Sequence, residues 1–254
     1  CSFCHEGSTP DGKHGDILNQ KFLSTFHPYQ EIAVGGGSVF EHPDFIPFLE
    51  NLKEQKVIAN ITVHQVHFMQ NLELIKKLQE EKLVYGIGVS VSAPTEELIK
   101  GLKSVPNTVC HVINGIWNER VAEMMAGKNL KVLILGYKEL RRGNEYIAAH
   151  DEIVVNNKKW LYDNLEKLLK KFKLISFDNL AIEQLNVKSF LSDEEWESFY
   201  QGDDGTSTFY IDAINQKFAQ SSTAPFEKRY DIGDLTMDEM FKIITDEYRK
   251  EKDR

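Results

Sequence analysis

Cysteine is scarce in this sequence: the 254 residues contain three, Cys1, Cys4 and Cys110. Three cysteines are too few for a disulfide framework in a chain of this length, and too few for a four-cysteine zinc site. The scarcity favours a reducing compartment, so we expect a cytoplasmic protein. No apolar run is long enough to cross a bilayer and no secretory leader is visible, so we expect no membrane partner.

Positive charge is also in deficit, with 30 Lys and Arg against 39 Asp and Glu and a formal net charge of -9. A general nucleic-acid surface needs a basic footprint, so we do not expect a nucleic-acid partner. The chain begins with Cys1 and not with Met, and we expect the native N-terminus to lie outside it. The remaining composition, 41% hydrophobic and 27% charged, is that of an ordinary globular domain.

Short apolar runs alternate with helical patterns between residues 31 and 178. The runs predict strands at Ile32–Gly36, Ile58–His64, Tyr85–Ser92, Thr108–Asn114, Lys131–Lys138 and Leu174–Asp178. Helices are predicted at Asp44–Gln55, Gln70–Glu81, Thr95–Lys103, Glu119–Ala126 and Asn156–Lys171. This order is typical of right-handed crossovers and a parallel sheet, so we expect an α/β fold with residues 1–178 as its core.

The pattern changes after Asp178, and we interpret residues 179–254 as an α+β extension of the same domain. Ser192 to Glu195 predicts a capping box for a short helix that ends at Phe199. A strand is expected near 209–214, and Thr236 is expected to cap a final helix.

Two neighbouring predicted strands carry small or polar residues on one face, namely Asn60, Thr62, His64, Gly86, Gly88, Ser90 and Ser92. An unpaired polar group in a dry interior costs roughly 1–3 kcal/mol, so such a face is costly inside a closed core. We therefore expect it to line a wet lumen that holds a ligand, as at the carboxyl ends of barrel strands. The alternative is a closed core in which these groups satisfy one another.

The first five residues read CSFCH, from Cys1 to His5. Four interpretations are open: c-type haem attachment, a redox dithiol, half of a zinc site, or part of an iron–sulfur loop. Haem attachment usually occurs on a helical scaffold, a dithiol belongs in a smaller fold, and zinc lacks a second cysteine pair. The context therefore favours the iron–sulfur loop.

A second motif follows, because residues 31–45 read EIAVGGGSVFEHPDF, a strand that ends in three glycines before a His-Pro-Asp turn. Together the two motifs resemble the radical S-adenosylmethionine (SAM) superfamily. That family has a three-cysteine loop after its first strand and a Gly-Gly-Glu-Pro-type motif at the end of its second. Cys1 and Cys4 match the second and third cysteines, and Phe3 matches the aromatic residue before the third. The first cysteine and strand one are then expected outside the chain, with that cysteine four residues before Cys1.

The resemblance implies a TIM-like partial (β/α)6 parallel barrel without its first strand. It implies an enzyme that cleaves SAM reductively with a [4Fe–4S] cluster and abstracts hydrogen from a small-molecule or peptide substrate. A reductant such as flavodoxin or ferredoxin would be its partner. Cys1 and Cys4 would bind the cluster, and the residues around the cofactors would be Phe3, Gly35, Gly36, Gly37, Ser38, Ser90, Ser92, Asn114 and Gly136.

Two residues depart from the family pattern: Ser38 occupies the position of the usual Glu, and Val39 that of the usual Pro. A neutral Ser accepts a hydrogen bond from the SAM amino group without charge assistance. The alternative interpretation is therefore a degenerate, non-catalytic relative that binds a cluster or metal as a scaffold or redox sensor.

Substrate residues are suggested by position alone. Lys138, Arg141 and Arg142 follow a predicted strand at its open end, where one or more would neutralise an anionic substrate group; the alternative is a solvated loop. His64 and Asp178 are candidates for proton exchange with substrate, or else paired lumen residues. Cys110 lies roughly 13 Å before the site end of its predicted strand, at about 3.3 Å per residue, and we expect a buried small hydrophobe there.

Overall fold

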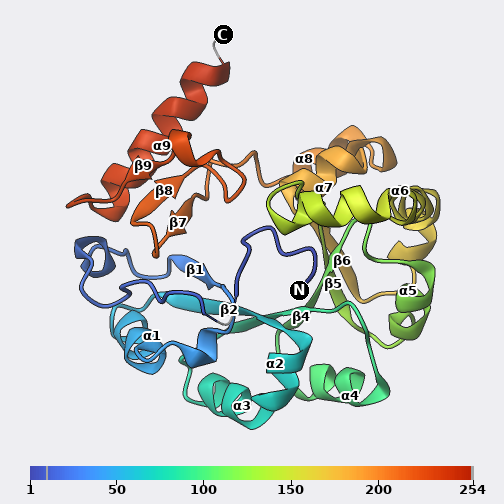
Figure 1. Ribbon diagram of the computed structural model, residues 1–254, viewed down its shortest axis with the longest axis horizontal. Coiled ribbons are helices and arrows are strands. Elements are labelled where there is room, and N and C mark those ends of the chain that lie inside the picture. Colours follow the sequence, from blue (N-terminus) through green and yellow to red (C-terminus); the bar gives the residue numbers. More distant parts are fainter. Residues whose placement is uncertain (10, 253–254) are drawn as a thin grey trace.

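A six-stranded parallel sheet forms the centre of the computed structural model, which describes residues 1–9 and 11–252. Its strands are β1 (Glu31–Val34), β2 (Ile58–His64), β3 (Gly86–Ser90), β4 (Thr108–Ile113), β5 (Lys131–Leu135) and β6 (Leu174–Phe177). Each strand pairs with the next along the chain, so β1 and β6 form the two edges (Figure 1). This α/β arrangement is consistent with a partial TIM-like fold, and all six predicted strands are confirmed.

Helices connect the strands: α1 (Phe45–Glu54), α2 (Gln65–Gln70), α3 (Leu72–Glu80), α4 (Glu96–Ser104), α5 (Glu119–Met125) and α6 (Arg142–Leu169). Short 3-10 helices occur at Lys21–Ser24 (η1), Val39–Glu41 (η2), Val187–Phe190 (η3) and Phe226–Lys228 (η4). The sequence did not predict α2 or the first half of α6. Helix α2 follows β2 without an intervening turn, and α6 is broken at His150, whose φ of -139° is not helical.

Alternation along the strands decides which face meets the helices. Ala59, Ile61 and Val63 of β2 are at most 4% exposed, while Asn60 and Thr62 between them are half-buried. Because right-handed crossovers between sequential neighbours place their helices on one face, the apolar positions form a core beneath them. Helix α6 contributes Leu161, Leu165 and Leu168 to this core, since all three are buried.

The C-terminal part adds helices and a small antiparallel sheet. Its elements are α7 (Asn179–Gln184), α8 (Asp193–Phe199), β7 (Tyr210–Asp212), β8 (Lys217–Ala219), β9 (Tyr230–Asp231) and α9 (Met237–Lys252). The predicted capping box is present, because the side chains of Ser192 and Glu195 bond each other's backbone amides. Thr236 caps the final helix as predicted, and it exchanges the same pair of bonds with Glu239. The strands β8 and β9 were not predicted.

The N-terminal segment lies between the sheet and the C-terminal part. In Figure 1 the N-terminus lies near the centre of the molecule, beside the labels of β4, β5 and β6, with β7–β9 and α9 to one side. The Met237 backbone N–H donates to Thr25 Oγ1 at 2.9 Å, and His27 lies 2.9 Å from Asp238. One cluster of buried apolar side chains joins the two regions, including Phe22, Phe218 and Met240.

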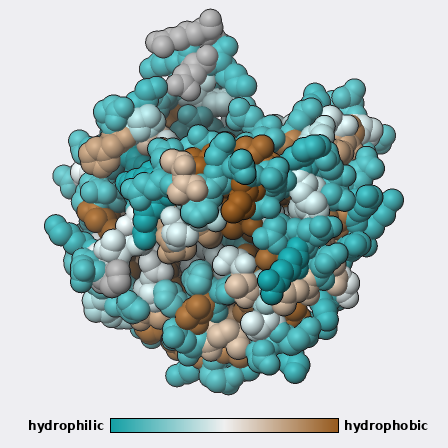
Figure 2. Space-filling model, turned by 45° about the vertical axis from the view of Figure 1, so that its right-hand side comes forward, coloured by the Kyte–Doolittle hydropathy of each residue, from teal (hydrophilic) through white to brown (hydrophobic). Residues whose placement is uncertain are grey.

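Hydrophilic side chains cover most of the face shown in Figure 2, and apolar ones gather toward its middle. Among the described residues, no helix combines the length and apolarity needed to span a membrane.

Candidate functional site

Polar side chains from three strands meet in register at the carboxyl edge of the sheet. His64 of β2 pairs with Ser90 of β3, and Ser90 pairs with His111 of β4. All three side chains are half-buried, whereas the neighbours that face the helices are buried. This agrees with the expected polar face and places it at the edge where α/β folds build their sites.

His111 is a site residue that the sequence interpretation missed. Its ring lies across Gly88, where an added Cβ would be 2.3 Å from His111 Cε1 and 3.0 Å from Thr62 Oγ1. Burial lowers the pKa of His111 to about 4, so the imidazole is neutral at pH 7. Gly88 therefore leaves the space that this neutral ring occupies on the polar face.

The cysteine loop, residues 1–9, forms a compact turn. The backbone N–H of Cys4 donates to the carbonyl of Cys1 at 3.3 Å, and that of Gly7 donates to the carbonyl of Cys4 at 3.1 Å. Burial alone would raise the pKa of the Cys4 thiol. Hydrogen bonds from the backbone of Ser8, Glu6 and Gly7 and from the Ser8 hydroxyl outweigh it, and the pKa falls below its ordinary value. The loop thus favours a thiolate, the form of cysteine that binds metal.

The first turn of α6 holds this loop. Arg141 donates to the backbone carbonyl of Glu6 and also lies 3.2 Å from its carboxylate, and Arg142 donates to the backbone carbonyl of Ser8. The Phe3 ring makes an edge contact with Tyr146, with centroids 5.5 Å apart. The two arginines that the sequence suggested for substrate therefore bond the cysteine loop.

Arg141 has a strained backbone. Its φ of 49° and ψ of -122° lie in a region that residues with a Cβ rarely adopt. Such a conformation costs on the order of 1–3 kcal/mol and is concentrated at functional sites. At Arg141 the conformation accompanies the bonds that its side chain makes to the cysteine loop.

The glycine run, Gly35–Gly37, lies next to the cysteine loop. A Cβ on Gly37 would meet Ser8 Cβ at 3.6 Å, and one on Gly35 would meet Thr62 Cβ at 3.9 Å. Gly36 has a φ of 153°, and an added Cβ there would meet nothing within 4 Å. The run therefore approaches the loop and the polar face, and Gly36 is exposed with open space beside it.

The next residues turn the chain away from this edge. Ser38 precedes η2, where its side chain makes no capping hydrogen bond. His42 accepts at Nδ1 from the Asp44 backbone N–H and lies 2.8 Å through Nε2 from the Gly15 carbonyl. The His-Pro pair thus binds the segment that follows the cysteine loop.

Three other predicted cofactor residues lie further from the loop. Ser92 is exposed beyond the end of β3, where its backbone N–H donates to Gln65. Asn114 is 1% exposed; its Nδ2 donates to Gln184 of α7 at 3.0 Å, and its Oδ1 has no partner among the described residues. Gly136 is covered by α7, because an added Cβ would lie 2.4 Å from Leu180 Cγ. Contacts of these residues with a cofactor stay predictions.

Asp178 and His64 both cap helices. Asp178 Oδ1 accepts from the backbone N–H groups of Gly136 and Ala181, each at 2.8 Å. His64 Nδ1 accepts from the Val66 backbone N–H at 3.3 Å. Burial, followed by the positive charges of His67 and the Cys1 amino group, lowers the pKa of His64, which is therefore neutral at pH 7.

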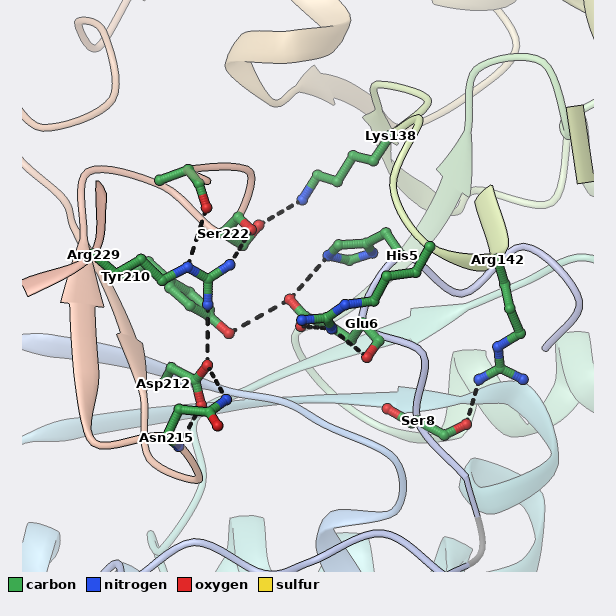
Figure 3. Close-up of polar contacts among 12 residues, drawn as sticks. His5, Glu6, Ser8, Lys138, Arg142, Tyr210, Asp212, Asn215, Ser222 and Arg229 are labelled. Atoms are coloured by element: carbon green, nitrogen blue, oxygen red, sulfur yellow. Dashed lines mark hydrogen bonds and ion pairs between the residues drawn. The ribbon is translucent and has the colours of Figure 1, made fainter. Parts of the chain in front are cut away.

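Lys138 enters the same region from the connection between β5 and α6. Its Nζ donates to Ser222 Oγ at 2.9 Å (Figure 3). Nearby, Arg229 forms a buried ion pair with Asp212 at 3.0 Å and lies over the Tyr210 ring. Burial, followed by the charges of Glu6 and Asp212, raises the pKa of Tyr210 to about 12.

The cysteines divide into two kinds. Cys110 is 1% exposed, which confirms the expected burial, and that burial raises its pKa to about 12. Within the described residues, no three His, Cys, Asp or Glu side chains lie close enough together to hold a metal ion. A role for Cys1 and Cys4 as cluster ligands stays a prediction.

Comparisons with known proteins add no relative: no protein-family model, no curated protein and no solved structure matches this chain.

Proposed function

We propose that this chain is the core of a radical SAM enzyme, which uses a [4Fe–4S] cluster and SAM to abstract hydrogen from a substrate. One observation carries the proposal: the cysteine loop and the glycine run, 29 positions apart between Ser8 and Gly37, lie together at the carboxyl edge of a parallel sheet. On this interpretation the strand missing from the barrel would pair with β1, at the edge of the sheet.

The residues of the cysteine loop and the glycine run fit the two cofactors. Cys1 and Cys4 would hold the cluster, with a third cysteine expected four residues before Cys1, and the lowered pKa of Cys4 suits a metal ligand. The open space beside Gly36 would admit SAM, with Ser38 and Ser90 at its polar groups. The chemistry these cofactors supply is reductive cleavage of SAM to a 5′-deoxyadenosyl radical that takes hydrogen from substrate.

The protein residues position and protect that chemistry. The backbone amides of residues 6–8 stabilise the Cys4 thiolate, and Arg141 and Arg142 fix the loop that carries them. Neutral His64 and His111 place no positive charge on the polar face. A reductant such as flavodoxin or ferredoxin would deliver the electron.

The test uses the product of the complete open reading frame, purified without oxygen, reconstituted with iron and sulfide, reduced, and supplied with SAM. We expect 5′-deoxyadenosine and methionine to form. The Cys4→Ala variant should form neither, and Cys110→Ala, which removes a thiol distant from the loop, should retain the activity. Equal activity in the two variants would refute the proposal.

A second candidate, a relative that binds a cluster without cleaving SAM, is favoured by one observation: the neutral Ser38 hydroxyl replaces the family's carboxylate. It predicts a loaded cluster and no 5′-deoxyadenosine with any candidate substrate or stronger reductant. Activity that appears in Ser38→Glu would then identify this position as the cause.

A further inference from the structure

Lys138 is a cation at this edge of the sheet that has neither an acidic partner nor a bond to the cysteine loop among the described residues. Arg229 pairs with Asp212, and Arg141 pairs with Glu6, whereas Arg142 bonds a backbone carbonyl. Across the described ranges 1–9 and 11–252, Lys138 forms no ion pair, and its hydrogen bond goes to a serine hydroxyl. A half-buried ammonium group without a carboxylate is free to bind an anionic ligand.

Three hydroxyl groups follow one another in the segment that Lys138 contacts, the hydroxyl loop Ser221–Thr223. Ser222 Oγ accepts from Lys138, and Ser221 Oγ lies 2.7 Å from Thr223 Oγ1. All three side chains are half-buried. Serine and threonine hydroxyls rotate to donate as well as to accept, so the loop can supply donors to a ligand that Lys138 attracts.

A buried arginine fixes the hydroxyl loop. Arg229 Nη2 donates to the Ser222 carbonyl and its Nε to the Ala224 carbonyl, both at 3.1 Å. Its side chain is 5% exposed, and Asp212 holds its third donor. Figure 3 shows Arg229, His5 and Lys138 extending toward one another from three separate segments. The loop is therefore held in place before any ligand binds, which lowers the entropic cost of binding.

We infer that Lys138 and the hydroxyl loop form a subsite for a phosphate group of the substrate. A phosphate ester has three or more oxygens, which matches one ammonium group and several hydroxyls, whereas a carboxylate is matched better by an arginine fork. At this edge Lys138, Arg141, Arg142 and Arg229 accompany two carboxylates, those of Glu6 and Asp212, although the chain's net charge is -9, so the local field would draw an anion there. The assignment to a substrate rests on the proposed function, but the binding does not.

Inorganic phosphate is the probe, titrated at constant ionic strength into the ¹⁵N-labelled full chain without a cluster. The backbone amide resonances of Ser221, Ser222 and Thr223 should shift and saturate. In Lys138→Met the apparent Kd should rise by about tenfold or more, because a charge-assisted contact is lost, while Lys138→Arg should stay near wild type. Lys100→Met, which removes an exposed charge on α4, should bind like wild type.

The inference would be overturned if the amide shifts did not saturate by about 20 mM phosphate. It would also be overturned if Lys138→Met and Lys100→Met bound phosphate with equal affinity. Acetate that binds as tightly as phosphate would overturn the assignment to phosphate. Because the titration needs no cluster, intact phosphate binding without 5′-deoxyadenosine formation would refute the proposed function alone.

Discussion

The Cys4 thiol accepts hydrogen bonds from donors of its own loop, and these donors should make the thiol more reactive at low pH. We expect Cys4 in the cluster-free chain to be alkylated by iodoacetamide with a pH midpoint below the ordinary thiol value of 9.0, because backbone amides stabilise the thiolate. Cys110 provides an internal control, since its pKa of about 12 and its burial should prevent reaction until the chain unfolds. Mass spectrometry after pulses at different pH values measures both.

The Ser8→Ala variant loses the side-chain donor to Cys4 and should move the midpoint upward. A midpoint at or above 9.0 in the wild type would contradict the description of the loop.

His111 makes a distinct contribution to the pH dependence of folding stability. Its folded pKa of about 4 lies below the ordinary 6.5, so the unfolded chain binds a proton that the folded chain does not between these values. Stability from this group is therefore present above pH 6.5 and lost as the pH falls toward 4. We expect about 2 kcal/mol less stability at pH 5 than at pH 8 through His111 alone.

Urea unfolding of the wild type and His111→Gln at the two pH values isolates this contribution. The variant should lose less stability on acidification. Parallel losses would mean that His111 is accessible to protons in the folded chain.

At the scale of elements, the start of α6 combines a strained backbone at Arg141 with side-chain contacts to the cysteine loop. Arg141→Gly relieves the strained backbone, so we expect a melting temperature equal to or above that of the wild type. The same change removes the bonds to Glu6, so the midpoint of Cys4 alkylation should move toward its ordinary value. Calorimetry and the alkylation assay measure the two effects.

Lys82→Gly is the matched control, because Lys82 also has a positive φ, of 55°, and lies between α3 and β3. It should leave Cys4 reactivity unchanged. A Cys4 midpoint unaffected by Arg141→Gly would show that α6 does not hold the loop.

The elements could be predicted where one signal was strong. Apolar alternation identified all six strands of the sheet. The spacing of Ser192 and Glu195, and the position of Thr236, identified the caps of α8 and α9, because these caps are bonds between residues close in sequence. Helix α2 could not be predicted, because no turn separates it from β2 and its cap is His64, an unusual capping residue. The strands β8 and β9 are two or three residues long, too short for a periodic signal.

The candidate site was predicted only in part, for a related reason. Cys1, Cys4 and the glycine run are contiguous motifs, so the sequence revealed them. Lys138 and Ser222 are 84 positions apart, and Tyr210 and Glu6 are 204 apart, so no local pattern records those contacts. Nor does the spacing of Gly88 and His111 reveal that the ring lies across the glycine.

At the scale of the whole molecule, the C-terminal sheet depends on a buried ion pair. Arg229→Met would leave Asp212 buried without its cation, and we expect a loss of about 3–5 kcal/mol in the free energy of unfolding. Lys217→Met breaks the pair with Asp231, whose side chain is 83% exposed, and should cost less than about 1 kcal/mol. Urea unfolding measures both, and equal losses would contradict the buried role of Arg229.

The N-terminal and C-terminal segments contact each other over the carboxyl edge of the sheet, where the proposed function would place its cofactors. An added Cβ on Gly15 would lie 2.7 Å from the Ala213 backbone, and Lys138 reaches Ser222 across the same edge. On the proposed function, the cysteine loop and the glycine run would bind the cluster and SAM together.

The most direct test is the electron paramagnetic resonance spectrum of the reduced, reconstituted protein with and without SAM. The account predicts a [4Fe–4S] signal that SAM alters in the wild type. In Gly36→Val the side chain would occupy the open space beside the glycine run, at a φ of 153° that strains a residue with a Cβ. The signal should persist and no longer respond to SAM. A wild-type cluster that SAM leaves unchanged, or the absence of any cluster, would contradict the account.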